Sequence, residues 1–176
     1  MKQDKTPVNW SQDTYRVLKQ AGVKQVAYVP DAGHSELIRT FHADREAKTV
    51  VLTTEEEGVA MLGGAWLGGE RGVLLMQSSG VGNCINILGT IAECRFPLLA
   101  LVTMRGQWGE FNPWQVPMSQ ATAPSLAAIG VIVYPVDDPA RVAETVEAAA
   151  QLVFNAERAA AVLISQRIIG AKSFKK

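Results

Sequence analysis

The chain has 176 residues, of which 48% are apolar and 19% charged, a composition that excludes a disordered protein. Lysine and arginine together number 17, as do aspartate and glutamate, so the formal net charge is zero and nothing favours binding to nucleic acid or to an anionic membrane. We expect one domain over 1–176, with tails at 1–9 and 171–176. The polar first residues predict no signal peptide, and no apolar run is long enough to span a bilayer.

Six short apolar runs along the chain are predicted to be β-strands, because each is bounded by turn residues and is apolar at successive rather than alternate positions. In chain order they are 25–30, 49–52, 72–77, 97–103, 131–136 and 160–165. Such strands, separated by helices, predict an α/β fold. We expect a doubly wound, mostly parallel six-stranded sheet with helices on both faces.

Helical periodicity and capping residues mark the segments between the strands. In chain order we expect a helix that Ser11 caps and Gly22 ends, one with Leu37, Ile38 and Phe41 on one face, one from the glutamate run to about Gly68, one to about Cys94, a short one near 125–129, and a long one with Pro139 at its first position. The segment 104–117 is expected to be irregular. Because ligands bind beyond the carboxyl ends of strands in such sheets, the loops that follow the first four strands are the candidate site.

The two cysteines, Cys84 and Cys94, fall in one predicted helix about 15 Å apart, which is too far for a disulfide between them. We expect both to be reduced core thiols of a cytoplasmic protein. No spacing of histidine and cysteine predicts a metal site built by this chain.

Three consecutive glutamates follow the second strand and are assigned different roles. With Thr54 as N-cap, Glu57 completes a Thr-x-x-Glu capping box, and Glu55 is expected to be solvated. The positions three, four and seven residues after Glu56 are small or apolar, so we expect its carboxylate on the face that packs on the sheet. A carboxylate there requires a partner, which favours ligand binding. The alternative is a surface glutamate that only stabilises the helix dipole.

The ordered set of these motifs resembles the pyrimidine-binding domain of thiamine diphosphate-dependent decarboxylases, of the sulfopyruvate and phosphonopyruvate decarboxylase type. The segment 56–68 is similar to that family's Glu-x-x-Ala-x-x-x-Ala-x-Gly-Tyr-Ala-Arg helix, with Ala65-Trp66 in place of Gly-Tyr and Gly68 in place of Arg. The segment 78–83 lies where the family has a Gly-x-Gly turn. The motifs at 29–31, 102–106 and 112–115 extend the resemblance over nearly the whole chain.

The resemblance implies that Glu56 is catalytic: it hydrogen-bonds N1′ of the aminopyrimidine and so promotes loss of the proton from thiazolium C2. It places further cofactor contacts at Pro30, Ser78, Gly80 and Gly82, for each of which ordinary turn chemistry is the alternative. The family's Gly-Asp-Gly and following Asn, which bind Mg²⁺ and the diphosphate, are absent from this sequence. We therefore expect a beta subunit that binds both, in an α2β2 or larger complex.

Four residues of the same loops are candidates for binding the substrate: His34, Asn83, Arg105 and Gln115. A guanidinium suits the second anionic group of a sulfonated or phosphonated 2-oxo acid, and a surface arginine is the alternative. A solvated loop histidine and a helix N-cap are the alternatives for the histidine and the asparagine. Gln115, Trp108 and Trp114 line a pocket wall or contact the partner subunit.

These features together predict the alpha subunit of a heteromeric thiamine diphosphate-dependent decarboxylase that converts a 2-oxo acid to an aldehyde and CO₂. The alternatives are a carboligase resembling acetolactate synthase, a non-catalytic binding subunit built on the same domain, and, more distantly, a flavodoxin-like nucleotide binder.

Overall fold

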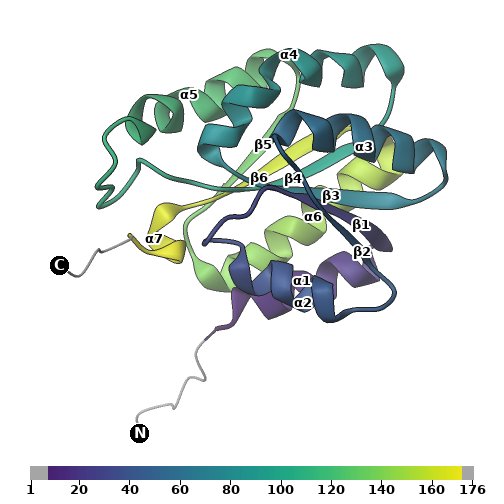
Figure 1. Cartoon of the computed structure of the whole chain (residues 1–176), viewed down its shortest axis with the longest axis horizontal. Helices are drawn as coiled ribbons and strands as arrows, with labels where there is room; N and C mark the ends of the chain where they lie inside the picture. The colour runs from purple at the N-terminus through teal and green to yellow at the C-terminus, as the bar shows by residue number, and fades with distance from the viewer. Residues whose placement is uncertain (1–7, 172–176) are drawn as a thin grey trace, which may run out of the picture.

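A computed structural model describes residues 8–171; most of the two predicted tails, 1–7 and 172–176, lies outside the described residues. One sheet has the strand order β2-β1-β3-β4-β6-β5, and every pairing in it is parallel (Figure 1). The strands are β1 (Val23–Tyr28), β2 (Lys48–Val51), β3 (Arg71–Gln77), β4 (Leu98–Thr103), β5 (Ile132–Val136) and β6 (Ala159–Ile164). The predicted six-stranded α/β fold is confirmed, and the described sheet is parallel throughout.

Helices cover both faces of the sheet (Figure 1). One face carries α1 (Trp10–Gln20), α2 (Ser35–Ala43) and α6 (Val142–Ala156), and the other carries α3 (Glu55–Leu67), α4 (Ser78–Cys94) and α5 (Gln115–Ala128). The short α7 (Gln166–Ile169) follows β6.

Each face of the sheet has its own hydrophobic core. Along β3, Val73 and Leu75 belong to the core under α1, α2 and α6, while Leu74 and Met76 belong to the core under α3 and α4. Successive side chains of a strand point to opposite faces, so a strand buried on both sides is apolar at every position. This double burial explains the continuous apolar runs of the sequence.

Several helix starts differ from the prediction. Asn9, not Ser11, caps α1: its side chain accepts a hydrogen bond from the Gln12 N–H at 3.1 Å. Where an irregular segment and a short helix were predicted, α5 begins at Gln115 and runs for 14 residues. Its Pro117 lies in the first turn, where a missing N–H costs little, although Pro124 lies inside the helix.

The start of the last long helix also differs. Pro139 opens a 3₁₀ turn, η1 (Pro139–Arg141), and α6 follows directly at Val142. The side chain of Asp138 accepts a hydrogen bond from the Ala140 N–H at 2.9 Å and so caps the turn. The proline therefore stands at a helix start, as predicted, but that start is a tighter turn than an α-helix.

Two glycines of α3 differ in how closely they pack on the sheet, and substitutions at them test this packing. A Cβ at Gly58 would lie 2.5 Å from Cδ1 of Leu74 and 2.8 Å from Cδ1 of Leu52, whereas nothing lies within 4 Å of a Cβ at Gly64. We predict that Gly58→Ala lowers the free energy of unfolding by about 1–3 kcal/mol through overpacking. Gly64→Ala, the matched control, raises it by up to about 1 kcal/mol because alanine has the higher helix propensity. Urea denaturation measures both, and equal effects would contradict this packing.

Candidate functional site

The predicted site loops all leave the carboxyl edge of the sheet, because all the strands are parallel. They follow β2, β1, β3 and β4, which are neighbours in the sheet in that order. Adjacent strands are about 4.8 Å apart, so four loops lie along one short edge. The fold thus brings together four segments that the sequence separates by up to 85 residues, from Pro30 to Gln115 (115 − 30).

The three glutamates at the start of α3 do not have the predicted environments. Glu55 is the buried one, with 5% of its surface exposed, and its Oε2 accepts a hydrogen bond from Nδ2 of Asn83 at 2.8 Å. Glu56 is exposed. Both the solvation predicted for Glu55 and the packed position predicted for Glu56 are therefore wrong.

The buried stripe of α3 explains the one-residue error. Its buried residues are Glu55, Gly58, Val59, Leu62 and Gly63, at the i, i+3, i+4, i+7, i+8 spacing of a helix face. Ala60, which the predicted stripe includes, is exposed.

The capping prediction for this helix is confirmed in part. Thr54 is the N-cap residue, but its side chain makes no capping hydrogen bond. Oε2 of Glu57 accepts a hydrogen bond from the N–H of Thr53 at 2.8 Å, one residue before the N-cap. Glu57 therefore does reach back over the helix start, although the reciprocal box does not form.

The segment after β3 is helical and is not the predicted glycine turn. It forms the first turns of α4, which begins at Ser78 directly after β3. Gly80 is buried and a Cβ there would lie 2.3 Å from Oε1 of Glu55, while Gly82 is exposed and a Cβ there would lie 3.0 Å from the sulfur of Met118. Asn83 lies in the second turn and is not an N-cap.

Two hydrogen-bonded pairs join strand ends beneath this edge: one joins the neighbouring strands β3 and β4, and the other joins β1 to β4, which lie on either side of β3. The Oγ of Ser78 is fully buried and accepts a hydrogen bond from the backbone N–H of Arg105 at 3.0 Å. The hydroxyl of Thr103 donates to Oδ2 of Asp31 at 2.6 Å. Pro30, by contrast, is exposed at the surface of the edge.

His34 is a core histidine. Its side chain is fully buried, Nε2 lies 3.0 Å from the carbonyl oxygen of Leu101, and Nδ1 has no hydrogen-bond partner. Burial lowers the pKa of His34 below its ordinary value, so the ring is neutral near pH 7. The alternative of a solvated loop histidine is wrong, and a substrate reaches this ring only if the loop moves.

Arg105 and Glu110 form a buried ion pair with side-chain exposures of 6% and 3%. Nε and Nη2 of Arg105 donate to the two carboxylate oxygens at 2.8 and 2.7 Å. Glu110 also accepts hydrogen bonds from Nε2 of Gln166 at 2.9 Å and from the N–H of Asn112 at 3.2 Å. Glu110 thus takes the Nε and Nη2 donors of a side chain that is only 6% exposed, and this geometry does not favour the predicted binding of a distal anion by Arg105.

The loop held by this ion pair displays aromatic side chains. Trp108 is 52% exposed and Trp114 is 70% exposed, and the guanidinium of Arg167 lies 3.8 Å from the centroid of the Trp108 ring. Gln115, the first residue of α5, has a buried Oε1 with no hydrogen-bond partner. Sequence reasoning missed Glu110 and Gln166, and no motif marks either of them.

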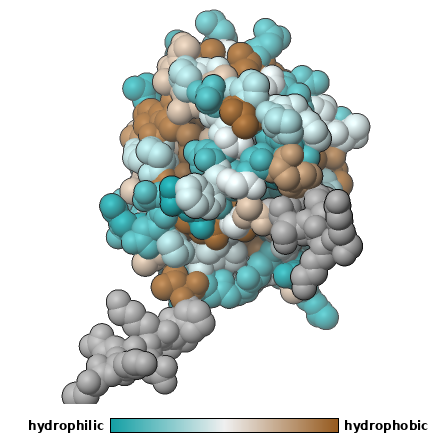
Figure 2. Space-filling model, turned by 90° about the vertical axis from the view of Figure 1, so that its left-hand side faces the viewer, coloured by the Kyte–Doolittle hydropathy of each residue, from teal (hydrophilic) through white to brown (hydrophobic). Residues whose placement is uncertain are grey.

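Figure 2 shows the face of the molecule that lies on the left in Figure 1, the side on which the loop after β4 and α7 lie. Apolar residues there form separate areas among hydrophilic ones. A hollow of about 480 Å³ at this edge is lined by Gly106, Gln107, Trp108, Ser119, Gln120, Asp137, Ser165 and Arg167.

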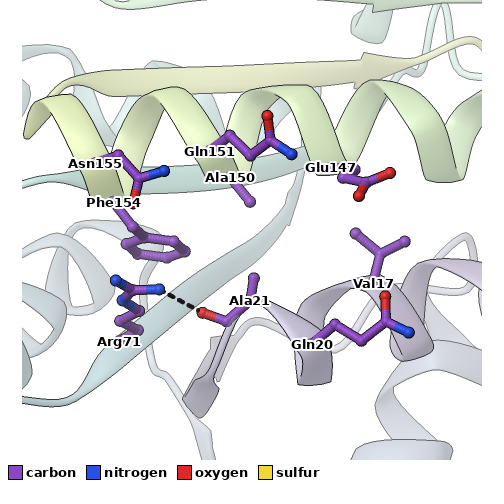
Figure 3. A pocket seen from close by; sticks show the side chains of 9 residues that line it. All are labelled: Val17, Gln20, Ala21, Arg71, Glu147, Ala150, Gln151, Phe154 and Asn155. Atoms are coloured by element: carbon purple, nitrogen blue, oxygen red, sulfur yellow. Dashed lines mark hydrogen bonds between the residues drawn. The ribbon is translucent and has the colours of Figure 1, made fainter.

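A smaller cavity of about 150 Å³ lies between α1 and α6 (Figure 3). There Nη1 of Arg71 donates to the carbonyl of Ala21 at 2.9 Å, and the guanidinium lies 5.1 Å from the centroid of the Phe154 ring. Because Arg71 begins β3, this cavity is at the amino edge of the sheet. It contains none of the predicted site residues.

The described residues contain no group of three or more His, Cys, Asp and Glu side chains placed to hold a metal ion. Among residues 8–171, no helix has the length and apolar character needed to cross a membrane. Cys84 is buried, and burial raises the pKa of its thiol to about 12, whereas Cys94 is exposed. The prediction of a core thiol is therefore right for Cys84 and wrong for Cys94.

Comparison with known proteins defines the class. Residues 8–120 match the family described as thiamine pyrophosphate enzyme, N-terminal TPP binding domain. The chain belongs to this family, as the sequence resemblance predicted. A chain of the 2-oxoglutarate:ferredoxin oxidoreductase from Magnetococcus marinus shares its fold, with a TM-score of 0.71 and 14% identity over 91% of this chain and 29% of that one.

The relatives within the family are more specific. The chain is 31% identical over 158 residues to sulfopyruvate decarboxylase subunit alpha of Methanococcus maripaludis. The aligned region covers 89% of this chain and 95% of the relative. Its identity to the subunit alpha of Methanothermobacter thermautotrophicus is also 31%, over 89% of this chain and 96% of the relative. Phosphonopyruvate decarboxylase of Streptomyces hygroscopicus is 38% identical over 90 residues, 51% of this chain and 22% of that protein.

The Arg105–Glu110 pair makes stability depend on pH. Mainly because Arg105 donates hydrogen bonds to it, the pKa of Glu110 falls from 4.5 to about 2 in the folded chain. A carboxyl group with a lowered folded-state pKa stabilises the fold above its unfolded pKa, and that stabilisation is lost as the pH falls from about 4.5 to about 2. We predict that Glu110→Gln lowers the free energy of unfolding at pH 7 by roughly 3 kcal/mol and flattens its decline on acidification.

The matched control is Glu144→Gln, which breaks an exposed Arg141–Glu144 pair with side-chain exposures of 69% and 62%. We expect a change within about 0.5 kcal/mol for this variant. Urea denaturation at a series of pH values measures both variants. If the two behave alike, the buried pair does not hold the loop.

Proposed function

We propose that this chain is the alpha subunit of a heteromeric lyase, a thiamine diphosphate-dependent decarboxylase that acts on sulfopyruvate or phosphonopyruvate and releases the aldehyde and CO₂. The observation that carries the proposal is the likeness to sulfopyruvate decarboxylase subunit alpha over 89% of this chain and 95% of that one. The position of Glu56, open at the carboxyl edge of the sheet, supports it.

The residues at this edge fit the pyrimidine half of the cofactor. Glu56 offers an exposed carboxylate in the first turn of α3, where the helix dipole stabilises negative charge. Gln115 offers a buried acceptor oxygen without a partner. Pro30 follows β1, and Ser78, Gly80 and Gly82 lie in the first turns of α4, but Ser78 and Gly80 are themselves buried. We propose that Glu56 holds the proton shared with the aminopyrimidine ring nitrogen.

Thiamine diphosphate, when bound, supplies the electron sink that makes loss of CO₂ possible. The chain's own part is to orient the pyrimidine through Glu56 and to hold that proton in place. Glu56 is exposed in the isolated chain, as expected for a residue that a partner subunit covers in the complex. Covering it would exclude water from the site and so protect the shared proton.

The sequence lacks the Gly-Asp-Gly motif and following Asn that the resemblance assigns to Mg²⁺ and the diphosphate. We propose that a beta subunit binds the diphosphate and Mg²⁺ and that the complex is α2β2 or larger, in the cytoplasm. The exposed Trp108 and Trp114 favour a contact with that subunit at the carboxyl edge, since aromatic side chains are enriched at interfaces.

The four predicted substrate residues differ in what they can offer. Gln115 has an acceptor oxygen free of partners. Asn83 donates to Glu55, His34 lies in the core, and Arg105 is occupied by Glu110. We propose that Arg105 acts on the shape of the loop at 104–114 and that other groups bind the distal anion of the substrate.

The catalytic assignment is tested in the complex co-expressed with its beta subunit. We predict that the alpha chain alone turns over no 2-oxo acid and that Glu56→Gln in the complex lowers kcat by at least about 100-fold, since a general acid–base group contributes about that much. Glu57→Gln, the matched control one residue along, retains kcat within a few-fold. Turnover by the alpha chain alone, or full activity of Glu56→Gln, would contradict the proposal.

The role of Arg105 is tested by comparing substrates. If Arg105 shapes the loop, Arg105→Ala lowers kcat/KM for sulfopyruvate and for pyruvate by similar factors. A guanidinium that binds the sulfonate would instead give a loss for sulfopyruvate at least about 10-fold greater than for pyruvate, because a charge-assisted hydrogen bond contributes roughly 1.5–3 kcal/mol. That larger loss would restore the anion-binding role.

A further inference from the structure

We infer that Glu55 is a positioning residue: through Asn83 it fixes the first turn of α3 on α4 and so sets where Glu56 meets the cofactor. The inference rests on the proposed function of Glu56 in the pyrimidine site.

The burial of Glu55 calls for a specific reason, because a buried carboxylate is costly unless it is hydrogen-bonded. Only 5% of its surface is exposed, and Nδ2 of Asn83 donates to Oε2 at 2.8 Å. The contact joins the first residue of α3 to the second turn of α4, across 28 residues of sequence. A glutamate at an exposed position of the same turn, such as Glu56, has no such desolvation cost. We therefore interpret the buried carboxylate of Glu55 as a contact that joins α3 to α4.

Gly80 makes room for this carboxylate. A Cβ at Gly80 would lie 2.3 Å from Oε1 and 2.4 Å from Cδ of Glu55. The carboxylate therefore lies directly against the first turn of α4, and it also lies in the first turn of its own helix. Both helix N-termini carry partial positive charge, which stabilises an anion placed between them. This packing explains why position 80 is a glycine although its backbone is helical.

The orientation of Glu56 follows from the position of Glu55. Successive residues of a helix are about 100° apart around its axis, so a Glu55 side chain held inward turns Glu56 outward. Gly58 and Val59 pack this helix on the sheet, but few side-chain hydrogen bonds fix its start. The side chain of Thr54 makes no capping hydrogen bond, and the side chain of Glu57 accepts only from the N–H of Thr53, at 2.8 Å, among the contacts described. Without the Glu55–Asn83 contact, the first residue of α3 loses its described hydrogen bond to α4, and the side chain of Glu56 is held less closely in place.

A double-mutant cycle in the alpha–beta complex tests the inference. Asn83→Asp places a second carboxylate against that of Glu55, and the two repel each other. We expect the affinity for thiamine diphosphate and kcat each to fall by at least 10-fold. Glu55→Gln alone keeps an acceptor for Asn83 and changes both by less than 3-fold. The double variant Glu55→Gln/Asn83→Asp restores the hydrogen bond with its direction reversed, so both quantities return to within 3-fold of wild type.

The matched control is Asn86→Asp, which adds the same charge on an exposed position of α4 one turn later. We expect no change beyond 3-fold. Gly80→Ala displaces the same carboxylate without changing any hydrogen-bonding group, so it reproduces the Asn83→Asp loss. Calorimetric titration with thiamine diphosphate and steady-state kinetics on assembled complexes measure these effects.

The inference is overturned if Asn83→Asp binds and turns over like wild type, or if the double variant is no better than Asn83→Asp. A wild-type complex that binds thiamine diphosphate but decarboxylates no 2-oxo acid contradicts the proposed function instead. In that case the cofactor affinities of the same variants still decide whether Glu55 and Asn83 act as a pair.

Discussion

Parallel pairing of all six strands is the constraint on which the rest of this structure depends. Each parallel connection has to cross back over the sheet, so both faces are covered by helices and the central strands contain continuous buried apolar runs. The same constraint collects every strand-to-helix connection at one edge. Residues that are far apart in the sequence, such as Pro30, Glu56 and Gln115, therefore share a surface that no single motif defines.

Polar contacts then fix the shape of that edge. Asp31 bonds Thr103, and Ser78 bonds the backbone of Arg105, so the ends of β1, β3 and β4 are joined beneath the surface. Arg105 and Glu110 hold the loop after β4. Such contacts order the loops before any ligand arrives, which lowers the entropic cost of binding. The exposed groups of the edge, Glu56 among them, belong to segments that these contacts hold in place.

Sequence patterns predicted the sheet well because double burial leaves a continuous apolar run in the central strands, although the edge strands β2 and β5 are only partly buried. They predicted the first turn of α3 poorly because Ala60 is small enough to lie on either face, so periodicity alone placed the buried glutamate one residue late. The general location of the site followed from the order of the loops. The identity of the buried carboxylate depended on the hydrogen bond from Asn83 to Glu55, which no spacing along the chain reveals.

Arg105 and His34 show a second limit of sequence reasoning. Both residue types suit substrate binding, and both lie in the right loops, yet Glu110 occupies the guanidinium and the imidazole lies under the loop against Leu101. A carboxylate that pairs with a guanidinium takes donors that a ligand would otherwise use, and the five-residue spacing from Arg105 to Glu110 gives no sign of that pairing in the sequence. Tertiary contact, not residue type, decided both cases.

The central claim is that this chain works as half of an active site, with its carboxyl edge facing the partner. Hydrogen–deuterium exchange of the alpha chain, alone and in complex with the beta subunit, tests it most directly. We predict that the backbone amides most protected by the partner lie at 53–60, 78–83 and 105–115. Protection confined to α1 and α6, or to the amino edge around Arg71, would contradict the claim.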